Sequence, residues 1–174
     1  MSHPGLQRSQ RGVFLLEVLI AIVIFAIGIL AMISMQAVSV AAQNDSQYRT
    51  EAEHLIDQLT SQMRMVVTHD SATGNIIASS FTDFAHNPGG PLCAFDTTIQ
   101  SGLPIAVAWL RSVRGLDGGG NPIPGKGLPG VTEARVQILT DNSTPGINQV
   151  RVTICWQAAN DKAAHSHSVV AYID

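Results

Sequence analysis

Residues 11–33 read Arg-Gly-Val-Phe-Leu-Leu-Glu-Val-Leu-Ile-Ala-Ile-Val-Ile-Phe-Ala-Ile-Gly-Ile-Leu-Ala-Met-Ile, and this stretch decides the fold. From Val13 to Ile33 it carries one charged side chain, that of Glu17. A bilayer is crossed by about 20 apolar helical residues, so the stretch predicts a helix that lies in a membrane or among other apolar helices. A charged carboxylate inside the apolar part of a membrane costs on the order of a few kcal/mol. The presence of Glu17 in this segment therefore calls for a functional explanation.

A short polar leader precedes the apolar run and ends at Gly12, five residues before Glu17. The arrangement resembles the signal of type IV pilins and related pseudopilins. The resemblance implies that a prepilin peptidase removes residues 1–12 by cutting between Gly12 and Val13, and that Val13 is then N-methylated. A Sec signal differs, because its apolar region spans about 7–15 residues and ends at a small-x-small cleavage site. An uncleaved single-pass anchor remains the alternative, and it leaves Glu17 unexplained.

The resemblance also implies a role for Glu17. In a filament its carboxylate would pair with the N-terminal ammonium of Val13 in a neighbouring subunit. Neither charge would then stay uncompensated in an apolar core, where breaking such a pair costs several kcal/mol. The alternative is an interfacial carboxylate without a partner, close to the lipid headgroups.

The helix is expected to continue beyond the apolar run, since no proline occurs from Val13 to Thr73 and the only glycine there is Gly28. One side then carries apolar residues at helical spacing: Ala52, Leu55, Ile56, Leu59, Met63, Val66 and Val67. We expect residues 13–35 to form a hydrophobic transmembrane or filament-core helix and residues 36–68 to form its amphipathic continuation. A coiled coil is the alternative, but the stripe is too short for a sustained heptad repeat.

Residues 69–174 are expected to form a periplasmic globular domain. Turn-forming residues predict loops at His69–Pro91 and Gly115–Gly130. Ile105–Val113 is compatible with a short helix or a strand, and its helical offsets after Pro104 favour the helix. Alternation predicts strands at Glu133–Thr140, Gln149–Gln157 and Ser168–Ile173, with a hairpin connection at Asn142–Asn148. An antiparallel sheet with one apolar face, packed on the amphipathic half of the long helix, gives an α+β fold. The resemblance implies that this fold is of the type IV pilin kind.

The two cysteines, Cys93 and Cys155, both follow the apolar segment. In an oxidising compartment such a distant pair indicates a disulfide. One face of the central predicted strand carries Val150, Val152, Ile154 and Trp156. If that face meets the helix, Cys155 points to the outer side of the sheet, and the loop that carries Cys93 folds over it.

Composition and motifs give no sign of catalysis. The formal net charge is −3 and no block of Lys and Arg occurs, so no nucleic-acid binding is predicted. His165 and His167, with Asp161 nearby, are a weak candidate metal site that we interpret as an exposed approach to the last strand. His69–Ser71 is contiguous and lacks the spatial logic of a catalytic triad. We therefore predict no catalytic residue, metal or cofactor; a membrane-anchored periplasmic enzyme or sensor is a remote alternative.

Several segments are similar to PilV-type minor pilins, also called type IV pilus modification proteins: Glu17–Ala21, Ala108–Arg111, Leu128–Gly130 and Arg151–Gln157. Val13 departs from this family, which commonly has an aromatic residue or Met at the first mature position. The resemblance implies a minor pilin that helps to initiate, assemble or cap type IV pili, with effects on twitching motility and adhesion.

The same resemblance implies partners and a location. The partners would be other minor pilins, the major pilin, the prepilin peptidase and the inner-membrane assembly platform. The chain would reside in the inner membrane with a periplasmic C-terminal domain and then join the pilus, at its tip. A minor pseudopilin of a type II secretion system is the alternative, since both families share the features of the N-terminal half.

Overall fold

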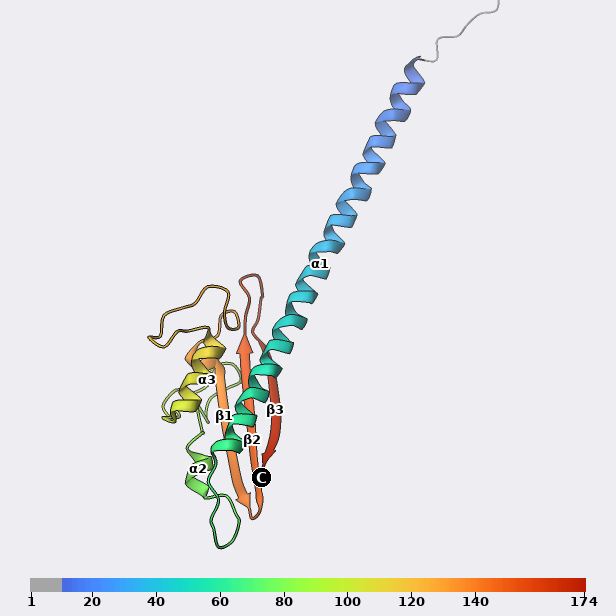
Figure 1. Cartoon of the computed structure of the whole chain (residues 1–174). Helices are drawn as coiled ribbons and strands as arrows, with labels where there is room; N and C mark the ends of the chain where they lie inside the picture. The colour runs from blue at the N-terminus through green and yellow to red at the C-terminus, as the bar shows by residue number, and fades with distance from the viewer. Residues whose placement is uncertain (1–10) are drawn as a thin grey trace, which may run out of the picture. The chain divides into compact units, whose positions relative to one another are not determined.

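The computed structural model describes residues 11–174, apart from the side chains of residues 11–13, 37 and 41. Its elements in chain order are α1 (Arg11–Val66), α2 (Ala78–Thr82), α3 (Pro104–Arg114), a 3₁₀ turn η1 (Glu133–Arg135), β1 (Val136–Thr144), β2 (Ile147–Trp156) and β3 (His165–Ile173) (Figure 1). The chain forms two compact units, of which the first ends at Asp45 and the second spans Ser46–Asp174. The predicted α+β class, a long helix followed by a small antiparallel sheet, is confirmed.

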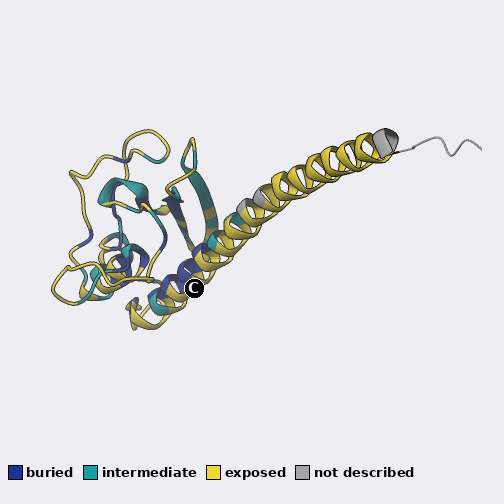
Figure 2. Cartoon of the chain, turned by 90° about the horizontal axis from the view of Figure 1, so that it is seen from above, coloured by how far each residue is buried: buried dark blue, intermediate teal, exposed yellow. Residues whose placement is uncertain are grey.

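Within the second unit, the last part of α1 buries one stripe of side chains (Figure 2). The buried residues of this stripe are Ala52, Leu55, Ile56, Leu59 and Met63, followed by Val67 just after the helix. They recur at spacings of three and four, which places them on one face of a helix, as the sequence predicts. The same apolar cluster includes the inner face of the sheet and four residues of α3.

The helix α3 begins at a proline, whose fixed φ suits a first helical turn, and ends at Gly115 in the left-handed conformation. Trp109 on α3 donates a hydrogen bond from Nε1 to the carbonyl oxygen of Leu55 on α1, at 2.6 Å. The predicted helix at Ile105–Val113 is thus present, and its tryptophan joins it to the core.

The three strands form an antiparallel sheet in the order β1-β2-β3. The inner side chains of β2, Val150, Val152, Ile154 and Trp156, are wholly buried, as their alternation predicts. The ladders pair them with Val136 and Ile138 on one side and with alternate residues of β3 on the other.

The predicted strand boundaries are wrong at several ends. β1 begins at Val136, because Glu133–Arg135 forms a 3₁₀ turn. The connection at Asn142–Asn148 is strand up to a two-residue turn, because Gly146 adopts a φ of 77° and lets Thr144 pair with Ile147. β3 begins at His165 rather than Ser168, since its first residues pair with the end of β2.

The segment predicted as a loop at His69–Pro91 contains the short helix α2. Its Phe81 and the following Phe84 are fully buried, so tertiary packing forms this helix inside a polar stretch. The Gly115–Gly130 loop also returns to the core, because the Leu128 N–H donates to the Val113 carbonyl at 3.0 Å and the Leu128 side chain is buried.

A disulfide joins Cys93 to Cys155, with 5.5 Å between their Cα atoms. Because Cys155 lies on the outer side of β2, the loop that carries Cys93 crosses the outer face of the sheet. The amide nitrogen Nε2 of Gln137 donates to the Asn87 carbonyl at 3.0 Å and holds the start of this loop on β1. Outer-face residues beneath it, Gln137, Thr153 and Cys155, are buried.

Candidate functional site

The residues that the sequence singles out lie at the start of α1. Gly12 and Val13 belong to its first turn, and their side chains, like residues 1–10, lie outside the described part of the chain. The leader prediction for residues 1–12 therefore concerns residues that are mostly outside it. Glu17 follows Val13 by four helical residues, so its exposed side chain lies on the same side of the helix as position 13.

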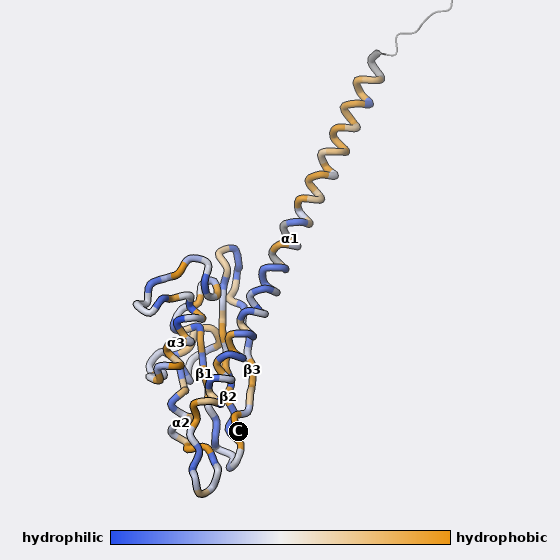
Figure 3. The backbone as a smooth tube through the Cα atoms, viewed as in Figure 1, coloured by the Kyte–Doolittle hydropathy of each residue, from blue (hydrophilic) through white to orange (hydrophobic). Residues whose placement is uncertain are grey.

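Figure 3 shows that hydrophobic residues predominate along the first part of α1, where Glu17 lies. Within the first unit every described side chain from Phe14 to Gln36 is exposed; Phe14, for example, is 66% exposed. Among the described residues, α1 is the one helix long and apolar enough to cross a membrane. So much exposed apolar surface is unfavourable in water and requires lipid or other apolar helices around it.

Glu17 is the only charged residue between Phe14 and Asn44. In the described part of the chain it makes no hydrogen bond or ion pair. The hydroxyl of Ser34, by contrast, donates to the carbonyl oxygen of Leu30 at 2.9 Å and is satisfied inside the helix. Glu17 is thus the one charged group of this segment, and a partner for it would have to come from outside the described residues.

A second polar cluster, which the sequence did not indicate, lies in the second unit. His86 is 1% exposed, and its Nε2 lies 3.6 Å from Oε1 of Glu133, whose other oxygen contacts the Arg114 guanidinium. The backbone N–H of Ser101 donates to Nδ1 of His86 at 3.4 Å, and Nδ2 of Asn87 lies 3.0 Å from its Nε2. Burial lowers the pKa of His86; the Glu133 carboxylate raises it and the Arg114 cation lowers it further.

The side chain of Asn87, next to His86, ties this part of the chain to the backbone around Glu133. Its φ of 49° is a conformation that Asn tolerates better than most residues. Its Nδ2 donates to the carbonyl oxygens of Glu133 at 2.7 Å and Val136 at 3.0 Å. The sequence marks Asn87 only as part of a turn-forming run, so the three-dimensional role of the residue was missed.

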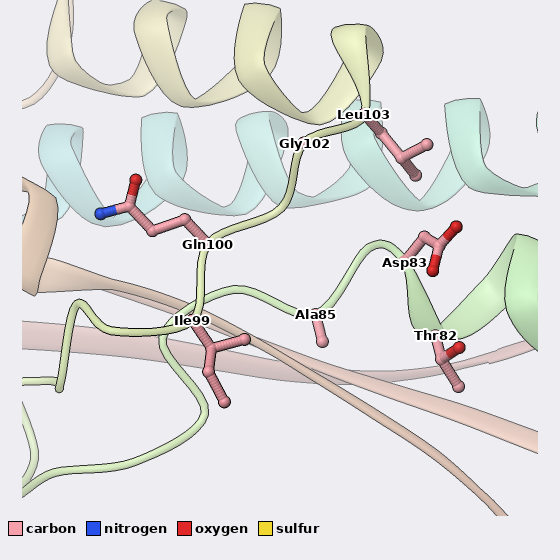
Figure 4. Close-up of a pocket in the computed structure, with 7 residues that line it drawn as sticks. All are labelled: Thr82, Asp83, Ala85, Ile99, Gln100, Gly102 and Leu103. Carbon is pink, nitrogen blue, oxygen red and sulfur yellow. The ribbon is translucent and has the colours of Figure 1, made fainter.

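Two hollows lie beside this cluster. One, of about 320 Å³, lies between the end of α2 and the segment that leads into α3 (Figure 4). Its lining residues are Thr82, Asp83, Ala85, Ile99, Gln100, Gly102 and Leu103. The other, of about 310 Å³, is lined in part by His86, Glu133 and two arginines of α3. Among the described residues no group of three or more His, Cys, Asp or Glu side chains is placed to hold a metal ion.

Two polar motifs that we interpreted from the sequence as non-catalytic, His69–Ser71 and His165 with Asp161, make contacts that stabilise the local fold. The Asp70 carboxylate accepts hydrogen bonds from the backbone N–H groups of Thr73 and Ala72, which lower its pKa and form a tight turn. The ring of His165 stacks on Trp156 with 6.1 Å between centroids, and its Nε2 lies 3.5 Å from Asp161.

Comparison with known proteins concerns the N-terminal segment. Residues 7–33 match a family model described as the prokaryotic N-terminal methylation motif. Neither the curated proteins nor the solved structures gave a match to this chain. The motif indicates a type IV pilin or a pseudopilin, a class of non-enzymatic structural proteins. It implies processing by prepilin peptidase and assembly with pilus machinery, and the apolar helix fits membrane anchoring.

Proposed function

We propose that this chain is a minor pilin that helps to initiate, assemble or cap type IV pili. The observation that carries the proposal is the methylation motif at residues 7–33, whose described part lies on a helix with exposed apolar side chains. Such a helix is stable when lipid or the helices of neighbouring subunits cover it. The resemblance of the C-terminal half to PilV-type minor pilins favours a pilus over a secretion system.

Glu17 has a defined part in this proposal. Cleavage between Gly12 and Val13 creates an ammonium group at Val13, and assembly brings it to the Glu17 carboxylate of a neighbour. Two opposite charges that enter an apolar bundle together cost far less than either one alone. The pairing therefore allows the helix to move from lipid into a filament and at the same time selects the depth at which subunits dock.

The rest of the chain is consistent with a periplasmic domain. Arg8 and Arg11 lie before the apolar segment, and Lys and Arg flanks favour the cytoplasmic side of a membrane. The disulfide between Cys93 and Cys155 is stable in an oxidising compartment. We place the domain in the periplasm first and then in the filament, near its tip, in contact with other minor pilins.

The test is the fate of Glu17→Ala in the native host. Sheared filaments should contain the parent chain, whereas the variant should be processed and folded but stay in the membrane fraction. Its insertion should be as good or better, because a costly polar group is gone. Glu53→Ala, a change of another exposed glutamate on α1, is the matched control and should enter filaments normally.

Two results would count against the proposal. Filament levels of Glu17→Ala equal to the parent would reduce Glu17 to an interfacial carboxylate. Unchanged surface piliation and twitching after deletion of the gene, together with a loss of protein secretion, would favour the type II secretion pseudopilin.

A further inference from the structure

The strand β3 forms one edge of the sheet. In the part of the chain that the structure describes, no strand lies beyond it (Figure 1). The opposite edge differs, because His86 and Ile138 exchange two backbone hydrogen bonds of 3.0 and 2.9 Å along β1. Among the described residues, the β3 edge has no such backbone pair.

The ladder tells which backbone groups of β3 are free. In an antiparallel ladder, the backbone groups of successive residues point to alternate sides of the strand. Ile138 bonds to His86, so its N–H and C=O point away from β2. Val152 lies opposite Ile138, so its own N–H and C=O point away from β1 and toward β3. Val152 pairs with Val169, so Val169 faces β2 and the residues on either side of it, Ser168 and Val170, face outward.

A separate contact supports this assignment. Nη2 of Arg64 donates to the carbonyl oxygen of Tyr172 at 3.1 Å from outside the sheet, as the same alternation requires. The guanidinium thus closes the edge at one end. Ser166, Ser168 and Val170 keep outward N–H and C=O groups for which the described chain offers no hydrogen-bond partner.

The edge also lacks the usual protection against pairing. Natural edge strands carry charged residues, proline or bulges that prevent another strand from adding. β3 reads His-Ser-His-Ser-Val-Val-Ala-Tyr-Ile, without a charged residue or a proline, and its nine pairs with β2 run without a register shift. The two outward serines are small, and Val170 and Tyr172 on the same outer face are 42% and 56% exposed.

We propose that β3 accepts an extended, uncharged segment of a different polypeptide as a fourth strand of the sheet. The hydrogen bonds would come from Ser166, Ser168 and Val170, and the exposed Val170 and Tyr172 would contact alternate side chains of the added strand. The inference rests on the proposed function, because it identifies the partner as another subunit of the same assembly.

A second copy of this chain does not fit the edge under that function. Antiparallel pairing of two β3 strands would run the two copies' helical residues 46–66 in opposite directions, whereas subunits held in one membrane or filament run the same way. Parallel pairing of two β3 strands about a two-fold axis would place each outward-facing residue opposite the same residue of the other copy. A parallel ladder does not allow this, because a residue whose backbone groups bond across the pair lies opposite one whose groups point away. The edge of β1 is already paired with His86 at Ile138, so head-to-tail pairing of β3 with β1 could not run along the whole strand.

The test combines Ser168→Pro with a photo-crosslinker. Proline at this position removes an outward N–H and leaves the ladder to β2 intact, so the sheet should fold. Ser168→Ala is the matched control: both variants lose the 2.9 Å hydrogen bond to Thr153, but alanine keeps the N–H. In the full-length chain in its host, p-benzoylphenylalanine replaces Tyr172 beside the edge.

With Ser168→Ala, light should give a covalent adduct whose mapped attachment lies in an extended segment of another chain. Ser168→Pro should reduce this adduct and the filament level at least tenfold, with the disulfide formed and the thermal midpoint within a few degrees of the control. Equal adduct yields for the two variants, no adduct in the control, or an adduct with a second copy of this chain would overturn the proposal.

If Ser168→Pro does not fold, Val170→Lys replaces it, since it keeps every backbone group and adds a charge at the edge. An adduct yield equal to that of the parent would then overturn the proposal, and a tenfold loss would support it. A chain that forms the adduct in membranes but never enters sheared filaments would contradict the proposed function while the strand pairing holds.

Discussion

Two ionisable side chains of this protein lie where their charged forms are costly. Glu17 belongs to a helix that is otherwise uncharged from Phe14 to Asn44, and His86 is almost completely buried. Each position is tolerable for its own reason. Glu17 gains a partner when the proposed assembly supplies an ammonium group, whereas burial lowers the pKa of His86 and so favours its neutral form. The pH and single substitutions should therefore act strongly at these positions.

Gly12→Leu should block removal of the leader, because the peptidase has to accommodate a small residue before the cut. The accumulated chain should retain residues 1–12, and intact-mass measurement of the membrane fraction checks this. Gly28→Ala is a suitable control, since an added Cβ at Gly28 meets nothing within 4 Å and the helix should be processed normally. A normal mature mass for Gly12→Leu would contradict the cleavage assignment.

Acidification should destabilise the second unit through His86. Its pKa in the folded chain is lowered by burial, so between that value and the ordinary pKa of about 6.5 the unfolded chain binds more protons. The stabilisation is fully present above the unfolded pKa and is lost as the pH falls through the folded pKa. The slope due to His86 is at most about 1.4 kcal/mol per pH unit.

Urea unfolding at neutral and mildly acidic pH, in the parent and in His86→Gln, measures this contribution. The variant should be less stable at neutral pH but should lose less stability on acidification. Parallel pH dependences in the two proteins would assign the acid sensitivity to groups other than His86.

At the scale of elements, α1, α3 and the sheet share one core, and two tryptophans differ in how they enter it. Both are buried, yet only Trp109 has a hydrogen-bond partner for its indole N–H among the described residues; Nε1 of Trp156 has none. A buried donor that is bonded stabilises by about 1 kcal/mol, whereas an unpaired one does not. The contribution of the hydrogen bond from Trp109 to Leu55 can therefore be measured by comparing substitutions of the two tryptophans.

Trp109→Phe should cost more than Trp156→Phe, by about 1 kcal/mol in the free energy of unfolding. The two substitutions remove the same atoms from buried sites, so the loss of packing largely cancels in the comparison. Urea titrations of both variants give the difference. An equal cost, or a larger one for Trp156→Phe, would mean that the bond to Leu55 contributes nothing net.

Elements with a strong local pattern could be predicted from the sequence. The long helix follows from an absence of proline and a stripe at helical spacing, and β2 follows from clear alternation. The helix α2 could not be predicted, because it forms where Phe81 and Phe84 bury themselves in a core that only the folded chain provides. The strand ends failed for a similar reason, since ladder partners decide them.

The candidate site divides in the same way. The signal around Glu17 is contiguous, so the order of residues alone indicated it. The cluster of His86, Arg114 and Glu133 joins three distant parts of the chain, and no spacing predicts such a contact. The alternation of β2 did predict the outer position of Cys155, because that position depends only on the parity of one strand.

For the second unit as a whole, the disulfide determines which part of the sheet is covered. The loop of the disulfide lies over Gln137, Thr153 and Cys155, while Val170 and Tyr172 on the same outer face stay exposed. One end of this face is thus part of the folded domain and the other end, next to the free edge of β3, is available for a partner. The disulfide keeps the loop that carries Cys93 over one end of the outer face and so leaves the other end exposed.

Replacing both cysteines, Cys93 by Ser and Cys155 by Ala, should lower the free energy of unfolding by about 2–4 kcal/mol. The cysteines are 62 residues apart, and the chain-entropy model gives about 4 kcal/mol for closing a loop of that length. For a domain whose total stability is about 5–15 kcal/mol this is a large fraction. Urea titration of the oxidised parent, the reduced parent and the double variant measures the loss.

The reduced parent should resemble the double variant, and reductant should leave the double variant unchanged, which separates the bond from the side chains. Amide exchange should rise at Gln137 and Thr153 when the bond is absent, since the loop no longer holds water away from them. It should not change at Ser168 and Val170, whose N–H groups face outward in every form. Free thiols in the unreduced, denatured parent, or no loss of stability on reduction, would mean that another contact holds the loop on the sheet.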